Sequence, residues 1–283
     1  MKLTPIKTQD LFANELIASP LTIAAKIGNK CVYMKLLSDG TVKGDLTTYT
    51  SINSAMNTMP IAANSTSNAW QFWSFFDHER NAWSPLEHLR AKLETQQRPN
   101  EIKTSKTHPL RIDEIHPPNA KGKIGLTFCP GKICDGLYGG RWERDLNTDI
   151  EAILAWGGKT LITLMETHEF EILGVTQFPT ALKNSQLNWL HIPIKDMQVP
   201  DSTFEATWAE NKAQLYEALK HGDSFVIHCR GGLGRTGLLA ARILTELGIN
   251  PVKAIQYVRD ARPNSIETYD QECYVLAQAW KAI

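Results

Sequence analysis

One stretch of the sequence, SFVIHCRGGLGRTGLLAARIL at residues 224–244, constrains the fold more than any other. The apolar run 224–229 predicts a buried strand, and apolar residues at helical spacing from Thr236 predict a helix to Leu247, stopped by Gly248. A glycine-rich turn joins the two elements. Such an arrangement places backbone N–H groups at a helix N-terminus, where they bind anions.

Two kinds of enzyme fit this turn. Gly232, Gly234 and Gly237 form the pattern G-x-G-x-x-G, which between a strand and a helix is typical of a dinucleotide-binding turn. Cys229 and Arg235 overlap it in the pattern Cys-x5-Arg, which predicts a thiolate that attacks phosphate. Both interpretations put an anion in the same place, but they predict different chemistry.

The residues after the helix argue against a dinucleotide-binding turn. A dinucleotide-binding half needs a further parallel strand with an acidic residue that holds the ribose. The following NPVKAIQYVRDARP has helical spacing instead, and Val252 and Lys253 stand where that acidic residue is expected. The sequence also argues against a P-loop ATPase, because no Gly-Lys-Ser/Thr follows the glycines. The sequence therefore favours the thiolate.

The loop residues suit phosphate chemistry. A strand over SFVIHC delivers Cys229 to the carboxyl edge of a sheet, where open α/β sheets bind ligands. The glycines allow a tight curve, and the planar fork of Arg235 can hold two phosphate oxygens. The amides and the helix dipole favour the thiolate form of Cys229. The predicted phosphate-binding residues are Arg230, Gly231, Gly232, Leu233, Gly234 and Arg235.

Two flanking residues have supporting roles. We expect the Thr236 hydroxyl to donate a hydrogen bond toward the sulfur of Cys229 when that sulfur leaves a phosphocysteine. We expect His228 to fix the loop through hydrogen bonds to the backbone and not to attack substrate.

The chain as a whole divides near residue 105. The segment TQQRPNEIKTSKTHPLRIDEIHPPNAKGK is polar and proline-rich, so we place an N-terminal region of unknown function at 1–105 and a catalytic domain at 106–283. In the first region, KCVYMKLLSDGTVKGDLTTYT predicts two strands around the turn SDG. An aromatic cluster there favours core packing over a ligand site; it comprises Trp70, Phe72, Trp73, Phe75, Phe76 and Trp83.

Strands and helices alternate in the second region. KIGLTF, KTLITLM, LNWLHIPI and SFVIHC read as strands, and helices are expected between and after them. Capping boxes at Ser202 with Glu205 and at Thr268 with Gln271 start two of the helices. We therefore predict an α/β fold with a mainly parallel central sheet flanked by helices, next to an unassigned α+β N-terminal region.

The composition of the chain argues against several classes of function. Thirty basic and thirty acidic residues cancel, so nothing indicates binding to nucleic acid or an anionic membrane. No apolar run is long enough to span a bilayer, and Glu15 and Pro20 interrupt the one N-terminal stretch that resembles a signal core. Five sparse cysteines predict free thiols, including Cys129 and Cys134, in a reducing cytoplasm.

The Cys229 loop and its flanking segments resemble a known family. HCRGGLGRTG is similar to the signature loop of cysteine-dependent protein phosphatases, in particular the dual-specificity branch that includes the kinase-associated phosphatases. FCPGK, RWERDLNTDIEAILAWGGKTLITLMETHE, HIPIKDMQVPD and ARPNSIETYDQECYV resemble the same group in order and spacing. The resemblance covers about residues 108–280.

The resemblance implies a two-step mechanism without metal or cofactor. Cys229 would form a phosphocysteine, a carboxylic acid would protonate the leaving oxygen, and water would then hydrolyse the intermediate. Asp196 matches the acid of the family, whereas Asp201, after Pro200, also reads as a helix cap. Gln271 would position the hydrolytic water or only complete its capping box. Glu166, His168 and Glu169 read as a solvated loop.

The expected substrate is a phosphorylated protein. The loop interior RGGLG has one charged side chain, Arg230, whereas phosphoinositide and RNA-triphosphate phosphatases built on this fold often add lysine or histidine there. Two alternatives remain open. One is a phosphatase of a non-protein ester such as an inositol phosphate, lipid or nucleotide, and the other is a weakly catalytic phospho-binding module. The sequence does not assign an oligomeric state.

Overall fold

The computed structural model describes residues 6–27, 30–59, 68–78, 82–96, 102–136 and 140–278. They form two compact units. The first comprises residues 1–101 with 136–140, and the second comprises 102–135 and 141–283. We keep the division between residues 105 and 106 as a prediction about independently folding domains.

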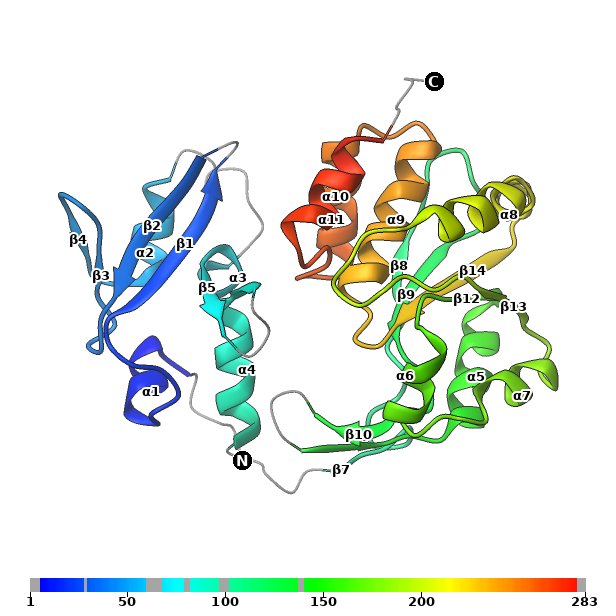
Figure 1. Ribbon diagram of the computed structural model, residues 1–283, viewed down its shortest axis with the longest axis horizontal. Helices are drawn as coiled ribbons and strands as arrows, with labels where there is room; N and C mark the ends of the chain where they lie inside the picture. Colours follow the sequence, from blue (N-terminus) through cyan, green and yellow to red (C-terminus); the bar gives the residue numbers. More distant parts are fainter. Residues whose placement is uncertain are drawn as a thin grey trace. The chain divides into compact units, whose positions relative to one another are not determined.

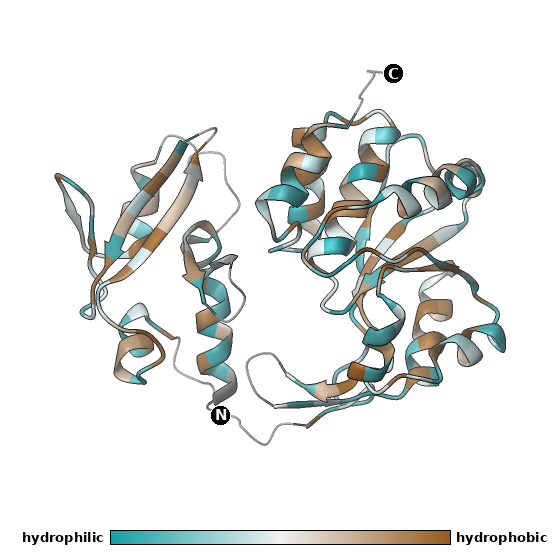
Figure 2. Ribbon diagram, viewed as in Figure 1, coloured by the Kyte–Doolittle hydropathy of each residue, from teal (hydrophilic) through white to brown (hydrophobic). Residues whose placement is uncertain are grey.

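The second unit is built on a five-stranded sheet. Its order is β13-β12-β14-β9-β8, and only β8 runs antiparallel to its neighbour. This confirms the predicted mainly parallel sheet. The strands are β8 (Asp113–Ile115), β9 (Ile124–Phe128), β12 (Gly158–Thr163), β13 (Asn188–His191) and β14 (Ser224–Cys229). The three central strands, β9, β12 and β14, are mostly buried and carry hydrophobic residues (Figure 2), as expected for a sheet covered on both faces.

Helices cover both faces of this sheet (Figure 1). On one face lie α5 (Leu146–Trp156), α6 (Thr167–Ile172) and α7 (Phe178–Lys183). On the other lie α8 (Ser202–His221), α9 (Gly234–Glu246), α10 (Pro251–Ala261) and α11 (Tyr269–Leu276). Every residue of β14 and nearly every residue of α9 is buried, so the strand–loop–helix of residues 224–246 lies in the core.

Helix caps explain most of the boundaries. Asn250 starts α10, and Thr268 with Gln271 forms the predicted capping box of α11. The predicted box at Ser202 with Glu205 is wrong. The cap of α8 is Asp201, whose Oδ1 accepts from the Phe204 N–H at 2.9 Å. Glu205 turns instead to the guanidinium of Arg242 on α9, at 2.7 and 2.8 Å.

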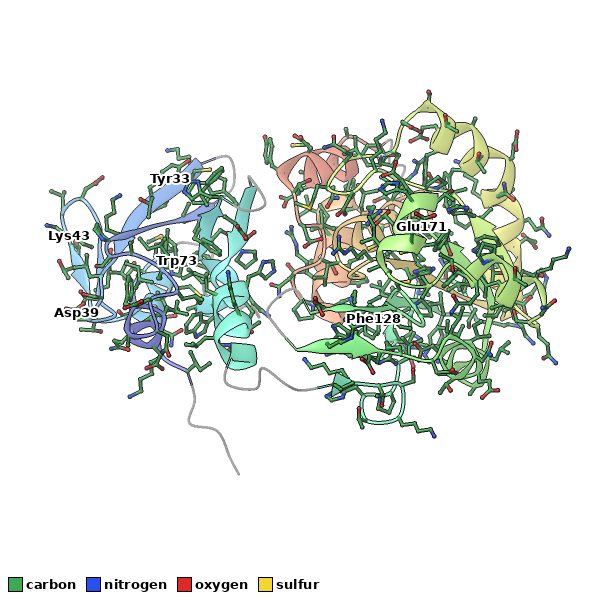
Figure 3. The ribbon with its side chains drawn as sticks, turned by 60° about the horizontal axis from the view of Figure 1, so that its bottom comes forward. Tyr33, Asp39, Lys43, Trp73, Phe128 and Glu171 are labelled. Carbon is green, nitrogen blue, oxygen red and sulfur yellow. The ribbon has the colours of Figure 1, made fainter. Side chains whose placement is uncertain are left out.

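A small sheet of three short strands was not predicted. Its order is β10 (Ile133–Asp135), β11 (Arg141–Glu143) and β7 (Ile102–Lys103). The Trp142 ring on β11 packs 5.3 Å from the Phe128 ring at the end of β9, which Figure 3 labels. This contact packs β11 against the end of β9 within the second unit.

The first unit has a six-stranded sheet of order β4-β3-β2-β1-β5-β6. The predicted strand pair around SDG is present, because β2 pairs antiparallel with β3. The strands are β1 (Leu21–Ile27), β2 (Lys30–Leu36), β3 (Val42–Lys43), β4 (Thr48–Tyr49), β5 (Ser74–Asp77) and β6 (Ala82–Pro85). The helices are α1 (Thr8–Ala13), α2 (Ile52–Asn57), α3 (Ala69–Phe72) and α4 (Leu86–Gln96).

The aromatic cluster of the first unit divides between core and surface. Trp73, labelled in Figure 3, is fully buried, and its indole N–H donates to the Ile52 carbonyl at 3.0 Å. Phe75 is buried as well, so the core interpretation is confirmed for these two. It is wrong for Trp83, which is 40% exposed and packs 5.9 Å from the exposed Tyr33 ring. Alternation along the strands places these two side chains away from the core.

Candidate active site

The Cys229 loop lies at the carboxyl edge of the sheet, between β14 and α9. Cys229 is buried, and its Sγ accepts a hydrogen bond from the Gly232 N–H at 3.2 Å. Gly232 has φ +71°, and a Cβ there would lie 2.2 Å from the Thr127 carbonyl oxygen. Only glycine fits both the backbone conformation and the space, so this position fixes the curve of the loop.

Arg262 holds the outer side of the loop. Its Nε donates to the Gly232 carbonyl, and its Nη2 donates to the Gly231 carbonyl at 3.1 Å. Nη1 pairs with Asp113 Oδ2 on β8 at 2.6 Å. In a trans peptide the N–H points opposite to the C=O. Anchoring these carbonyls outward therefore turns the N–H groups of Gly232 and Leu233 inward, toward the sulfur side.

Arg235 is fixed in the interior behind the loop. Its Nη1 and Nη2 donate to the two carboxylate oxygens of Glu169 at 2.6 and 2.9 Å. Nη1 also donates to the carbonyls of Leu164 and Ile194. Burial disfavours the charged guanidinium, but the bonds to Glu169 raise the pKa of Arg235 above its ordinary value. The arginine therefore remains a cation with a fixed orientation.

Glu169 contradicts the expected solvated loop at METHEF. It lies in the first turn of α6, where its Oε2 also accepts from the Glu166 N–H at 2.8 Å, and only 4% of the residue is exposed. Burial raises the pKa of its carboxyl, but the hydrogen bonds and the charge of Arg235 bring that pKa below its ordinary value. Glu169 is the buried counterion of Arg235.

The two candidate acids lie in different environments. Asp196 Oδ1 is 3.0 Å from Arg235 Nη2, and its side chain is about half exposed at 53%. The next residue, Met197, has φ +62° and donates its N–H to the same carboxylate. Asp201 caps α8. Only Asp196 of the pair is in contact with the Cys-x5-Arg motif, and its role as acid stays a prediction.

Gln271 is fully buried and does more than complete its box. Its Oε1 accepts from the N–H groups of Glu267 and Thr268 at 3.0 and 3.4 Å. Its Nε2 donates to the Gln198 carbonyl at 3.3 Å, in the segment that carries Asp196. Glu267, which was not singled out in the sequence, accepts from the Gly234 N–H at 2.9 Å.

His228 is fully buried near the end of β14, next to Cys229. Its Nε2 contacts the Thr163 hydroxyl at 2.7 Å, and that hydroxyl also accepts from the Trp189 indole at 2.9 Å. Nδ1 is buried and has no close hydrogen-bond partner in the part of the chain that the structure describes. Burial lowers the pKa of His228 to about 3, although a weaker bond to the Cys229 backbone offsets part of the fall, and the imidazole is neutral. The role of His228 in holding the loop stays a prediction.

The remaining loop residues are placed as follows. The Leu233 carbonyl accepts from the Gly237 N–H in the first turn of α9, and the Arg230 carbonyl accepts from the Cys129 N–H. The Thr236 hydroxyl is buried and has no hydrogen-bond partner among the described residues. Its predicted donation to a departing sulfur stays a prediction.

The chain carries free thiols, as predicted, at all five cysteines. Burial raises the pKa of Cys129 above its ordinary value, so that thiol is protonated. Within the ranges described above, no group of three or more His, Cys, Asp or Glu side chains could hold a metal ion. None of the helices described is both long and apolar enough to cross a membrane.

Comparison with known proteins gives concordant matches. A family described as PTP-SAK, "Swiss Army Knife protein, DSP-PTPase phosphatase domain", matches residues 141–275. Cyclin-dependent kinase inhibitor 3 from Homo sapiens is 30% identical over 56% of this chain and 72% of that protein, and the protein from Rattus norvegicus is 40% identical over the same shares. The probable protein tyrosine phosphatase type IVA B of Dictyostelium discoideum is 39% identical over 26% of this chain. The match spans 46%, about half, of that relative's length.

A solved structure agrees. The kinase associated phosphatase, with serine in place of its catalytic-site cysteine, has a TM-score of 0.52 and 27% identity over 60% of this chain and 98% of that one. Sequence and fold thus point to the same group as the loop motif does. The chain belongs to the dual-specificity branch of the cysteine-dependent protein phosphatases, and it resembles the kinase-associated group within that branch.

Proposed function

We propose that the chain hydrolyses phosphate monoesters on proteins, with Cys229 as the nucleophile. One observation carries the assignment: the Cys229 sulfur accepts a hydrogen bond from the Gly232 amide at 3.2 Å, in a loop whose closing arginine is fixed by two hydrogen bonds to Glu169 and two to backbone carbonyls. This arrangement would hold the equatorial oxygens of a phosphoryl group in line with the sulfur.

In the first step the Cys229 sulfur attacks phosphorus, the S–P bond forms and the ester P–O bond breaks. Asp196 gives its proton to the leaving oxygen. Asp196 lies on Arg235 at 3.0 Å, which supports this role, because a phosphate held by Arg235 would arrive beside the carboxyl group. The phosphate oxygens would take the place of Asp196 on the guanidinium.

In the second step water attacks the phosphocysteine. The O–P bond forms, the S–P bond breaks, and the Asp196 carboxylate takes the proton from water. The bond from Gln271 Nε2 to the Gln198 carbonyl supports a positioning role for Gln271, because it ties the acid segment to α11. Thr236 and the helix N-terminus would stabilise the departing thiolate.

A phosphorylated protein is the proposed substrate, and a phosphorylated protein kinase is the first to test. The relatives are described as protein tyrosine phosphatases, a kinase associated phosphatase and a cyclin-dependent kinase inhibitor. The cytoplasm is the proposed location. A non-protein phosphate ester is the alternative substrate, and a parallel assay with an inositol phosphate and a phosphopeptide distinguishes the two.

The test measures turnover of p-nitrophenyl phosphate and of a phosphopeptide, with EDTA present. Wild type should turn over both, and Cys229→Ser should be inactive. Cys273→Ser, which removes a thiol in the same unit, serves as the matched control and should be unchanged. An inactive wild type would leave the phospho-binding module as the better account, and an active Cys229→Ser would exclude the phosphocysteine.

The acid is assigned by a second pair of variants. Asp196→Ala should lose turnover at normal stability. Asp201→Ala should keep turnover and lose about 1 kcal/mol of stability, because it removes a helix cap. Loss of turnover in Asp201→Ala alone would reverse the assignment.

A further inference from the structure

One carboxylate that takes no part in the proposed reaction is hydrogen-bonded to a backbone amide of the phosphate loop. Glu267 Oε2 accepts a hydrogen bond from the Gly234 N–H at 2.9 Å. Gly234 is the last residue before Arg235 in the loop and the first residue of α9. The amide that it presents is therefore one of those expected to bind a phosphate oxygen.

The direction of this amide follows from the helix. The preceding carbonyl, that of Leu233, accepts from the Gly237 N–H at 2.8 Å and so points along the axis of α9. In a trans peptide the N–H of Gly234 must then point out of the helix N-terminus. The helix dipole favours a negative charge at that end. The carboxylate of Glu267 meets this requirement in the structure.

The contact is held in place from both sides. The Glu267 N–H donates to the buried Gln271 Oε1 at 3.0 Å, and the Ile266 N–H donates to the Leu233 carbonyl at 3.3 Å. A Cβ on Gly234 would lie 2.7 Å from Glu267 Oε2, so the glycine is what allows the carboxylate to approach. Glu267 is thereby fixed against the loop.

We propose that Glu267 is an internal competitor of the substrate phosphate and so sets the affinity of the site for oxyanions. The inference rests on the proposed function and names a residue that regulates the same site. A phosphate dianion cannot share the Gly234 N–H with a carboxylate, because the two negative charges repel each other at hydrogen-bonding distance. Phosphate must displace Glu267, and that displacement weakens binding without changing the bond-making groups.

The test is direct binding of inorganic phosphate to the full chain by calorimetry. Glu267→Gln keeps an oxygen acceptor for the amide but removes the charge, and it should bind phosphate about tenfold more tightly than wild type. Glu267→Ala removes the acceptor as well and should bind at least as tightly. Asp270→Asn, which removes an exposed carboxylate three residues away, is the matched control and should bind as wild type does. Circular dichroism checks the fold of each variant.

Unchanged or weaker phosphate binding in both Glu267 variants would overturn the proposal. So would a fall in kcat with no change in phosphate affinity, since Glu267 would then act in the chemistry. In the assay with p-nitrophenyl phosphate, KM should fall and kcat should hold. Because calorimetry needs no turnover, failure of this inference can be told apart from failure of the proposed function. If wild type is inactive but Glu267→Gln binds phosphate more tightly, only the proposed function is wrong. If wild type is active but Glu267→Gln does not bind phosphate more tightly, only this inference is wrong.

Discussion

Glu169→Ala tests whether a buried counterion orients Arg235. The substitution removes the acceptors of two hydrogen bonds, at 2.6 and 2.9 Å, and leaves a guanidinium whose side chain is only 1% exposed. Removing one partner of a buried ion pair costs about 3–5 kcal/mol. Because the Leu164 and Ile194 carbonyls still accept from Arg235, we expect the lower end, about 3 kcal/mol, and a Tm lower by about 10 °C.

Thermal and urea unfolding measure the stability change, and turnover of p-nitrophenyl phosphate measures the function. We expect kcat/KM to fall by at least about 100-fold, since a misoriented Arg235 no longer meets the phosphoryl oxygens. Glu171→Ala changes an exposed glutamate on the same helix, labelled in Figure 3, and should behave as wild type. A stable and active Glu169→Ala would refute the reasoning.

The pH dependence of the same pair has a definite sign. Folding lowers the pKa of the Glu169 carboxyl, so its contribution to stability is present above the unfolded pKa of about 4.3 and is lost as pH falls through the folded value. The stability difference between wild type and Glu169→Gln should therefore narrow below about pH 4. A difference that widens on acidification would contradict the ion-pair assignment.

Three further predictions concern the loop and its support. Gly232→Ala should abolish turnover, checked by steady-state kinetics, because its Cβ would lie 2.2 Å from the Thr127 carbonyl oxygen at a φ that favours glycine. Arg262→Met should lower kcat/KM by about tenfold or more, because the Gly231 and Gly232 carbonyls lose their donor; unchanged kinetics would mean that the loop holds its shape unaided. The folded pKa of His228, about 3, lies below its unfolded value of about 6.5. On acidification between these two values, the free energy of unfolding should therefore fall by up to about 1.4 kcal/mol per pH unit. In urea titrations at several pH values, His228→Gln should lack this dependence of stability on pH.

Sequence patterns correctly predicted those elements that are determined by residues close together in the chain. The strand at 224–229, the glycine-rich turn and the helix after it follow from apolar spacing and from residues that tolerate a tight curve. The capping box of Thr268 with Gln271 is equally local. The box at Ser202 failed because Asp201, one residue earlier, caps the helix, and Glu205 is bound by Arg242 from another helix.

The missed site residues all depend on contacts between distant parts of the chain. Glu169 is 66 residues from Arg235 in sequence, and Asp113 is 149 from Arg262. A glutamate in METHEF or an arginine in ARPNS gives no local sign of burial, because burial of a charge depends on the partner that tertiary structure brings to it. Tertiary packing likewise decided that Trp83, on β6, is exposed, while Trp73, at the end of α3, is buried.

The most direct test of the central claim traps the intermediate. Wild-type enzyme is mixed with p-nitrophenyl phosphate in the presence of EDTA, quenched in acid within the first turnover and digested for mass spectrometry. The account predicts a phosphoryl group on the peptide that contains Cys229, absent from Cys229→Ser. Turnover by Cys229→Ser, or a phosphoryl group trapped on a different residue, would contradict it.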